Sequence, residues 1–288
     1  MNTFINYIFL FISIIFLFSC AKDDVVPAAN NLSLQFNNTF KGNVIVLGEA
    51  NSNIASSNTS VSGQVHHFSE LKYVISNIRL VRADGSEYPY HMLNLDKGAT
   101  VIDQSKPQTL NFVLQDIPAG TYKTLKFGLG IKQELNVLDQ VKFPGFYALA
   151  GANDTKMMWE WGTGYRFTKI EGFYDTDHKT LSIHTGSTVA GKEGAYTQGV
   201  DAYREITLSL ETQAQVGKHA PIIRIQADFD KMLSGKLHTI TLSTGNGNAD
   251  NATPNIHTAV QMLRFVDNLA GNGSTDLSGM FSISKVEN

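Results

Sequence analysis

Short apolar runs recur along almost the whole chain, and each is bounded by glycine, asparagine, serine or proline. Residues 32–36 alternate apolar and polar side chains, which is the period-two pattern of a strand with one buried face. Similar runs follow at residues 44–47, 68–82, 109–114, 121–129, 165–173, 180–184, 204–210 and 222–229. Because many short strands separated by turns are typical of sandwiches and barrels, the pattern predicts an all-β, antiparallel β-sandwich or barrel-like single domain.

Helical spacing of apolar side chains appears in few places. Residues 255–269 carry it over several turns, and residues 230–233 are consistent with a single turn. Two further segments, 186–199 and 245–255, are rich in glycine, asparagine and threonine, and loops of that length often carry function. We therefore expect long loops and one or two short helices around the strands.

The amino-terminal segment is almost wholly apolar and ends at the only cysteine of the chain. Its apolar core has the length of a signal-peptide h-region and is too short for a membrane-spanning helix, which needs about 20 residues. Residues 17–20, Leu-Phe-Ser-Cys, resemble the lipobox of bacterial lipoproteins. Acylation would also account for a lone cysteine in an exported protein. We expect a signal peptide over residues 1–19, lipidated Cys20 with a tether over 20–31, and a β domain over 32–288.

The residues after Cys20 bear on the location of the protein. Lys22, Asp23 and Asp24 resemble a surface-export signal of lipoproteins in some Gram-negative bacteria, although the same residues also suit a merely polar tether. Both interpretations stay open. We therefore expect an outer-membrane lipoprotein, facing the periplasm or exposed at the cell surface, that contacts the membrane through its lipid anchor.

Composition and missing motifs exclude several functions. The net charge is only −3 and no basic stripe is present, which argues against a nucleic-acid partner. The sequence contains no phosphate loop, no dinucleotide glycine fingerprint and no nucleophile elbow. Carboxylates brought together by folding leave no local pattern, and Glu160 and Glu171 are the acids worth testing. We expect that the chain is not an enzyme.

Both tryptophans lie in one block, residues 156–167. On a strand Met157, Trp159 and Trp161 would share a face, so the block is either an aromatic core stripe or part of a site. Eight histidines are spread over the chain. With Cys20 acylated, a transition-metal site would have to use imidazole, carboxylate or methionine sulfur. Any such site must be assembled from distant segments, and a single histidine is more often a surface or hydrogen-bonded imidazole.

Several blocks together resemble the MbnP-like family, exported copper-binding proteins that are found beside a di-haem, peroxidase-like partner. The blocks are residues 71–80, 117–122, 158–161 with 164–165, 169–172, 183–186 and the late helix beginning near His257. In this family a tryptophan is oxidised to kynurenine by the partner, and histidines complete the copper site. The resemblance implies that Trp159 or Trp161 is modified, that His184 binds copper, and that His66 or His67 supplies a second ligand.

Glu171, His257 and Met158 are further candidate site residues. The resemblance thus implies a lipid-anchored protein of copper acquisition or handling. The alternative is a surface-exposed, ligand- or glycan-binding β-sandwich lipoprotein without a metal. Its motivation is the export signal together with the aromatic and asparagine-rich segments. Loss of binding on adding a chelator would separate the two, because only the first depends on copper.

Overall fold

Strands are the main secondary structure of the described chain and the helices are few and short, which confirms the prediction of an all-β sandwich. The predicted signal peptide and Cys20 lie outside the described residues. Among the described residues, no helix has the length and apolar character needed to cross a membrane. The computed structural model describes residues 29–136, 141–151, 156–159, 164–190, 197–243, 251–252, 255–256, 259–271 and 278–288.

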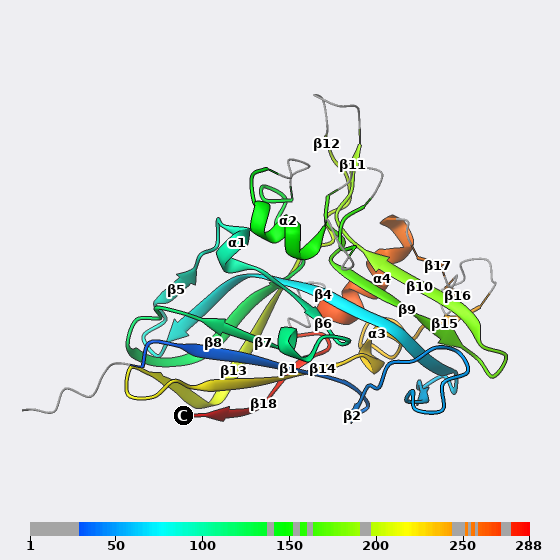
Figure 1. Cartoon of the computed structure of the whole chain (residues 1–288), viewed down its shortest axis with the longest axis horizontal. Helices are drawn as coiled ribbons and strands as arrows, with labels where there is room; N and C mark the ends of the chain where they lie inside the picture. The colour runs from blue at the N-terminus through cyan, green and yellow to red at the C-terminus, as the bar shows by residue number, and fades with distance from the viewer. Residues whose placement is uncertain are drawn as a thin grey trace, which may run out of the picture.

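The larger of the two main sheets has the strand order β13-β8-β4-β9-β10-β17, with β3, β5 and β6 also pairing with β4 (Figure 1). The neighbouring strands along β4 are antiparallel to it. The bounds of these strands are β3 Asn58–Thr59, β4 Val65–Arg82, β5 Glu87–Tyr90, β6 Thr100–Asp103, β8 Gly120–Leu129, β9 Thr168–Tyr174, β10 Lys179–Thr185, β13 Arg204–Val216 and β17 Asn255–Ile256.

The long strand β4 joins the two halves of this sheet. β9 pairs with its first half and β8 with its second half. The two partners meet at Val74, whose N–H donates to Phe167 O and whose carbonyl accepts from the Gly130 N–H, at 2.9 Å each. Since the N–H and carbonyl of one strand residue point to the same edge, β8 and β9 lie end to end along one side of β4.

The smaller sheet has the order β18-β14-β1-β2, with β7 pairing with β1. β1 and β14 run parallel, a detail that apolar alternation alone does not predict. The other pairings in this sheet are antiparallel. The bounds are β1 Leu32–Phe40, β2 Asn43–Val44, β7 Asn111–Leu114, β14 Ile222–Asp228 and β18 Phe281–Glu287.

Aromatic side chains from both sheets interlock in the core between them. Phe36 of β1 packs edge-to-face on Tyr73 of β4 and on Phe127 of β8, with ring centroids 6.0 and 6.2 Å apart. Phe281 of β18 contacts Phe127 at 5.1 Å. These rings are at most 4% exposed, and such edge-to-face pairs add about 0.5–1.5 kcal/mol each beyond burial. They hold the two sheets face to face and leave the outer face of the larger sheet to carry polar residues.

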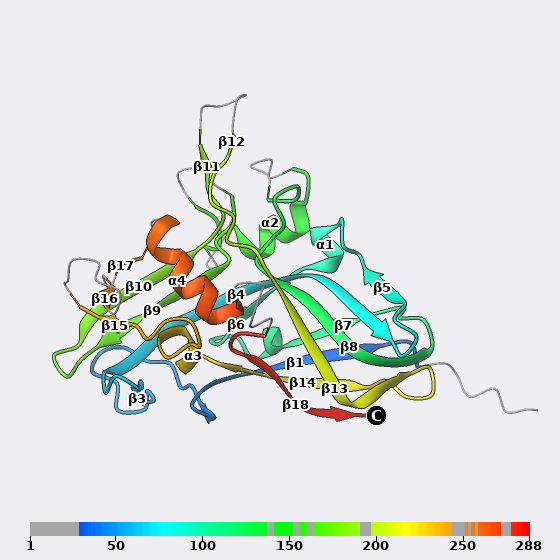
Figure 2. The same ribbon diagram turned by 180° about the vertical axis from the view of Figure 1, so that it is seen from behind.

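The helices are few and short (Figure 2). The predicted turn at 230–233 is α3, Asp230–Leu233, and the predicted helix at 255–269 is α4, Ala259–Ala270. Two helices were not predicted: α1, Leu95–Gly98, and α2, Pro144–Ala150, although α2 has a proline in its first turn. A 3₁₀ helix, η1, covers Pro107–Leu110 where a strand start was expected.

Two small strand pairs stand apart from the main sheets. The segment expected as a loop at 186–199 contains a paired ribbon, β11 Val189–Ala190 with β12 Thr197–Gln198, which projects at the same end of the molecule as α2 (Figure 1). β15, Thr241–Leu242, pairs in parallel with β16, Asn251–Ala252.

Candidate functional site

His184 lies on β10 beside an acid from β9. Its Nε2 is 2.5 Å from Glu171 Oε1 and 3.3 Å from Ser182 Oγ. Ser182 and His184 are two residues apart on one strand and so share a face, and Ser182 pairs directly with Glu171. This is the face turned away from the core, since Ile170 and Ile183 fill the other side. The His184 side chain is nevertheless buried, whereas Glu171 stays partly exposed.

Lysines surround the same acid-rich strip. Lys169, which pairs with His184 across the β9–β10 hairpin, forms an ion pair with Glu70 at 2.6 Å, and Lys72 does the same from β4. Burial alone would raise the pKa of Glu171, but hydrogen bonds from His184 and Ser182 and the charge of Lys169 bring it below its ordinary value. Glu171 is therefore ionised at neutral pH and offers a carboxylate to the imidazole.

Trp159 packs against His184. Their ring centroids are 5.7 Å apart and the planes are tilted by 58°. The backbone N–H of Trp159 donates to Gly164 O at 3.0 Å, so residues 157–159 lie alongside residues 164–166. The Arg166 guanidinium carbon lies 4.7 Å from the centre of the Trp159 ring. Trp159 is only 5% exposed, so the buried indole contacts both a cation and an imidazole.

Gly186 permits this close packing. A Cβ at that position would lie 2.9 Å from Trp159 Nε1 and 2.9 Å from Tyr165 O, closer than real Cβ atoms come. The Gly186 N–H also meets Met262 Sδ of α4 at 3.4 Å. Trp159 and the Met262 thioether of α4 therefore both lie next to Gly186, two residues after His184.

The structure thus brings His184, Trp159 and Glu171 together. Met158 is partly buried and packs on the core, and its carbonyl accepts from Arg166 Nη1 at 2.9 Å. Its neighbours Glu160 and Trp161 and the later His257 lie outside the described residues. Three site residues had not been proposed from sequence. Ser182 shares the strand face of His184 and was detectable by period two, whereas Arg166 and Met262 carry no local signal.

The expected second ligands, His66 and His67, do not reach His184. On β9, His67 pairs with Phe173 whereas His184 pairs with Lys169, four residues away. At about 3.3 Å per residue this is roughly 13 Å along the sheet. In this register His66 and His67 lie far from His184, on a strand that is separated from β10 by β9.

His66 and His67 also face opposite ways. His66 is fully buried in the core, where it stacks on Phe40 with ring centroids 6.4 Å apart. Burial lowers its pKa to about 4, which keeps the ring neutral. His67 lies on the outer face next to His178, at 5.6 Å between ring centroids. Adjacent histidines thus play two separate parts, one in the core and one on the surface.

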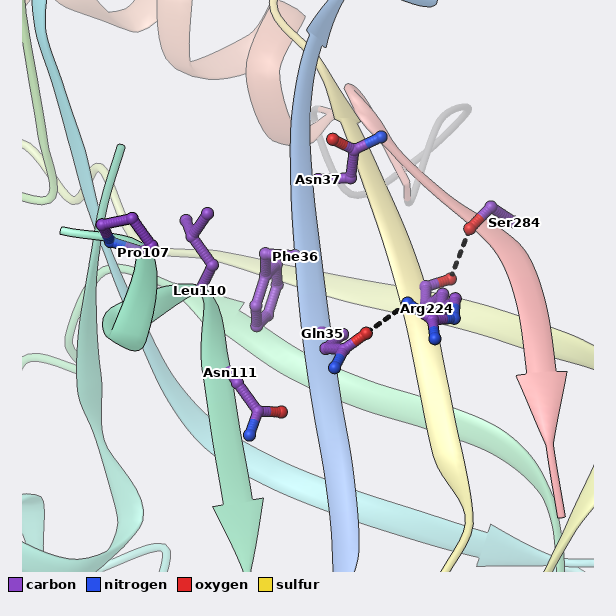
Figure 3. A pocket seen from close by; sticks show the side chains of 8 residues that line it. All are labelled: Gln35, Phe36, Asn37, Pro107, Leu110, Asn111, Arg224 and Ser284. Carbon is purple, nitrogen blue, oxygen red and sulfur yellow. Dashed lines mark hydrogen bonds between the residues drawn. The ribbon is translucent and has the colours of Figure 1, made fainter. Parts of the chain in front are cut away.

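A hollow on the smaller sheet does not belong to this site. It has a volume of about 370 Å³ and is lined by residues of β1, η1, β7, β14 and β18 (Figure 3). Its one cation, Arg224, donates to both oxygens of Glu287 at 3.1 and 3.0 Å and to Gln35. Because the guanidinium is already bound on two sides, this hollow does not offer its charge to an anionic ligand.

Imidazole and carboxylate groups meet at His184, and the Met262 thioether lies near Gly186, two residues further along the chain. All three are donors that copper accepts. A carboxylate on one ring nitrogen is the arrangement found behind metal-bound histidines, because it orients the ring and fixes the tautomer. Within the described ranges, no group of three or more histidine, cysteine, aspartate or glutamate side chains is placed to hold a metal ion.

Comparisons with known proteins agree with this arrangement of the fold. Residues 29–262 match the sequence profile of the family described as MbnP. The solved structure of MbnP from Methylosinus trichosporium aligns with 88% of this chain and 97% of that chain, at a TM-score of 0.57 and 14% sequence identity. At that identity the structural likeness shows the shared fold. A comparison with curated proteins gave no match.

Proposed function

Since this chain belongs to the MbnP family, we propose that it is an exported copper-binding protein in which His184 binds copper beside an oxidised Trp159. The family relationship suggests a methanobactin-related, copper-associated kind of protein. The observation that supports the finer proposal is the contact of His184 with Glu171 at 2.5 Å on one side and with the Trp159 ring at 5.7 Å on the other.

Glu171 orients the ligand. With Nε2 directed at the carboxylate, the imidazole is held in one position and its basicity is raised, which strengthens its bond to a metal. The lowered pKa of Glu171 keeps that carboxylate charged over the neutral range. Lys169 and Lys72 form ion pairs with Glu70 rather than with Glu171, so the Glu171 carboxylate stays available to His184.

Trp159 supplies the remaining chemistry after oxidation. An indole N–H is a donor only and cannot bind a cation through a lone pair. Two molecules of hydrogen peroxide, handled by the partner, each give one oxygen atom to the indole, one at C2 and one at C3. The C2–C3 bond breaks, and each peroxide leaves as water. Hydrolysis then releases the C2 carbon as formate. The product, kynurenine, carries an aryl amine and a ketone next to His184.

The partner in this proposal is a di-haem, peroxidase-like protein, and the chain itself has no enzymatic role. Cys20 carries the lipid that anchors it to the outer membrane, on the periplasmic side or at the cell surface. Replacing Cys20 with alanine is expected to move the protein from the membrane fraction to the soluble fraction. Retention of the Cys20→Ala protein in the membrane would contradict lipid anchoring.

Mass spectrometry tests the proposal. The full chain, produced with its partner, is expected to contain kynurenine at position 159 and to retain copper after dialysis. Trp159→Phe and His184→Ala are expected to lose the copper bound beside position 159, so that their copper content falls by one ion per chain, whereas His219→Ala, a matched control in the turn after β13, keeps it. Trp161→Phe tests the neighbouring tryptophan. An unmodified position 159 together with an unchanged copper content in His184→Ala would overturn the proposal.

A further inference from the structure

Two histidines face each other at the other end of the β9–β10 hairpin. His67 projects from the outer face of β4, and His178 lies in the turn just before β10. Their ring centroids are 5.6 Å apart, with the planes at 62°. We propose that His67 and His178 form a second metal site, for a copper or zinc ion whose remaining positions are filled by water.

The backbone holds both residues in place. β4 and β9 are in register at His67 and Phe173, and the turn is fastened by the Asp175 N–H donating to Val65 O at 2.9 Å. Gln64 Nε2 also donates to Asp175 Oδ1 at 2.9 Å. His178 has φ of +53°, a left-handed conformation that is uncommon for a residue other than glycine. Such a conformation is retained where the surrounding structure fixes it, and here it brings the ring to His67.

The separation of the rings suits one shared ion. A zinc- or copper-bound imidazole nitrogen lies about 2 Å from the metal, which puts the ring centre about 3 Å from it. Two imidazoles on one ion therefore have ring centres roughly 5 to 6 Å apart, depending on the angle at the metal. The 5.6 Å between His67 and His178 falls in this range.

The electrostatics also suit a cation. A neutral imidazole has a lone pair on one ring nitrogen that can bind a metal ion. His178 Nδ1 is buried without a hydrogen-bond partner among the described residues, which is a polar atom that needs a partner. Asp175 and Asp177 lie in the same turn, where they share Lys179 at 3.3 and 3.1 Å.

This site is separate from the one at His184. The two lie about four residues apart on β9, roughly 13 Å, and they share no residue. It needs neither an oxidised tryptophan nor a partner protein, because both ligands are unmodified imidazoles. Imidazole suits copper and zinc, and copper(II) is expected to bind more tightly than zinc(II) by the general order of divalent metals.

Metal titration of the unmodified protein tests this inference. The full chain is produced without the di-haem partner and titrated with copper(II) and zinc(II) salts by calorimetry. Electron paramagnetic resonance of the copper(II) form is expected to show nitrogen ligands. His67→Gln and His178→Asn are each expected to weaken binding by at least about tenfold and to change that spectrum. His184→Ala and His219→Ala are expected to leave both unchanged.

The variants are chosen so that the fold is kept. Asparagine tolerates the left-handed backbone at position 178, and glutamine at 67 keeps a polar side chain on the outer face. Thermal unfolding of each variant checks this, and His67→Lys, whose ammonium group has no lone pair, serves as a second variant. Copper(II) affinity unchanged in all these variants, or lost only in His184→Ala, would overturn the second site without bearing on kynurenine at position 159.

Discussion

The two ends of the β9–β10 hairpin carry histidines in contrasting settings. At one end His184 is buried, hydrogen-bonded to Glu171 and covered by Trp159. At the other end His67 and His178 are half-buried, face each other, and have their nearby acids tied to Lys179. The comparison shows that one sheet face can present imidazole in two ways, as a covered and oriented ligand or as an open pair.

The largest expected effect comes from breaking the sheet between the two ends. A Cβ at Gly172 would lie 2.0 Å from His67 O and 2.9 Å from Phe68 Cα, so backbone must move. Gly172→Ala is expected to lower the free energy of unfolding by about 4 kcal/mol, because β4 and β9 must separate. Chemical denaturation measures this, with exposed Thr176→Ala as the control at less than about 0.5 kcal/mol. Equal stabilities of the two variants would contradict the close packing.

The second effect concerns His66, the buried neighbour of the open pair. Its pKa is about 4 in the folded protein against 6.5 in the unfolded chain, so only the unfolded chain takes up a proton between these values. Stability is therefore full above pH 6.5 and is lost as the pH falls towards 4, by about 3 kcal/mol in all. His66→Phe is expected to remove this part of the pH dependence. Denaturation curves at several pH values measure it, and parallel losses in both proteins would contradict it.

A third change tests whether the covered end depends on its carboxylate. Glu171→Gln removes the charge beside His184, and copper affinity of the modified protein is expected to fall by about 10- to 100-fold. Because the pKa of Glu171 is held below 4.5, the effect persists at pH 5. Glu70→Gln is the matched control, since Glu70 binds lysines rather than the histidine. Equal losses of copper affinity in Glu171→Gln and Glu70→Gln would show that the effect comes from charge in general and not from the contact of Glu171 with His184.

The smallest effect is expected at the open end. Asp177 is exposed and contacts Lys179 at 3.1 Å, and exposed ion pairs contribute little to stability. Asp177→Asn is expected to change the free energy of unfolding by less than about 0.5 kcal/mol. Denaturant titration at low and high salt checks this. A loss of several kcal/mol would mean that the acids of the turn, rather than its backbone, hold the histidine pair.

Much of the fold follows from local pattern. Period two located β1, and similar apolar runs located β4, β8, β9, β10, β13 and β14, because each of these strands places apolar side chains in the core. The same alternation places His184 and Ser182 on one face. β18 was missed although Phe281 and Ile283 alternate, since it is a short edge strand with an irregular register against β14. The α2 helix was missed despite a proline in its first turn, because its seven residues are too few for a clear period.

The site depends on strand register, which is not local. Trp159 and His184 meet because a separate segment crosses the outer face of the sheet, and no spacing in the sequence encodes that contact. The pairing of His67 with His178 needs both the register of β4 on β9 and the left-handed turn residue. For the same reason the sequence could not show that His184 lies far from His66 and His67, since a sequence gives residue types but not how strands align.

The irregularity in β4 between Phe68 and Glu70 has a consequence for the choice between adjacent histidines. A one-residue slip of a strand sends every side chain to the opposite face, which here would exchange His66 and His67. The bulge between Phe68 and Glu70 fixes the pairing of β4 with β9, and β8 pairs with the other half of β4. A slip of β4 would therefore break contacts in both halves of the sheet. Two adjacent histidines would otherwise allow two alignments of β4, but only one alignment keeps these contacts.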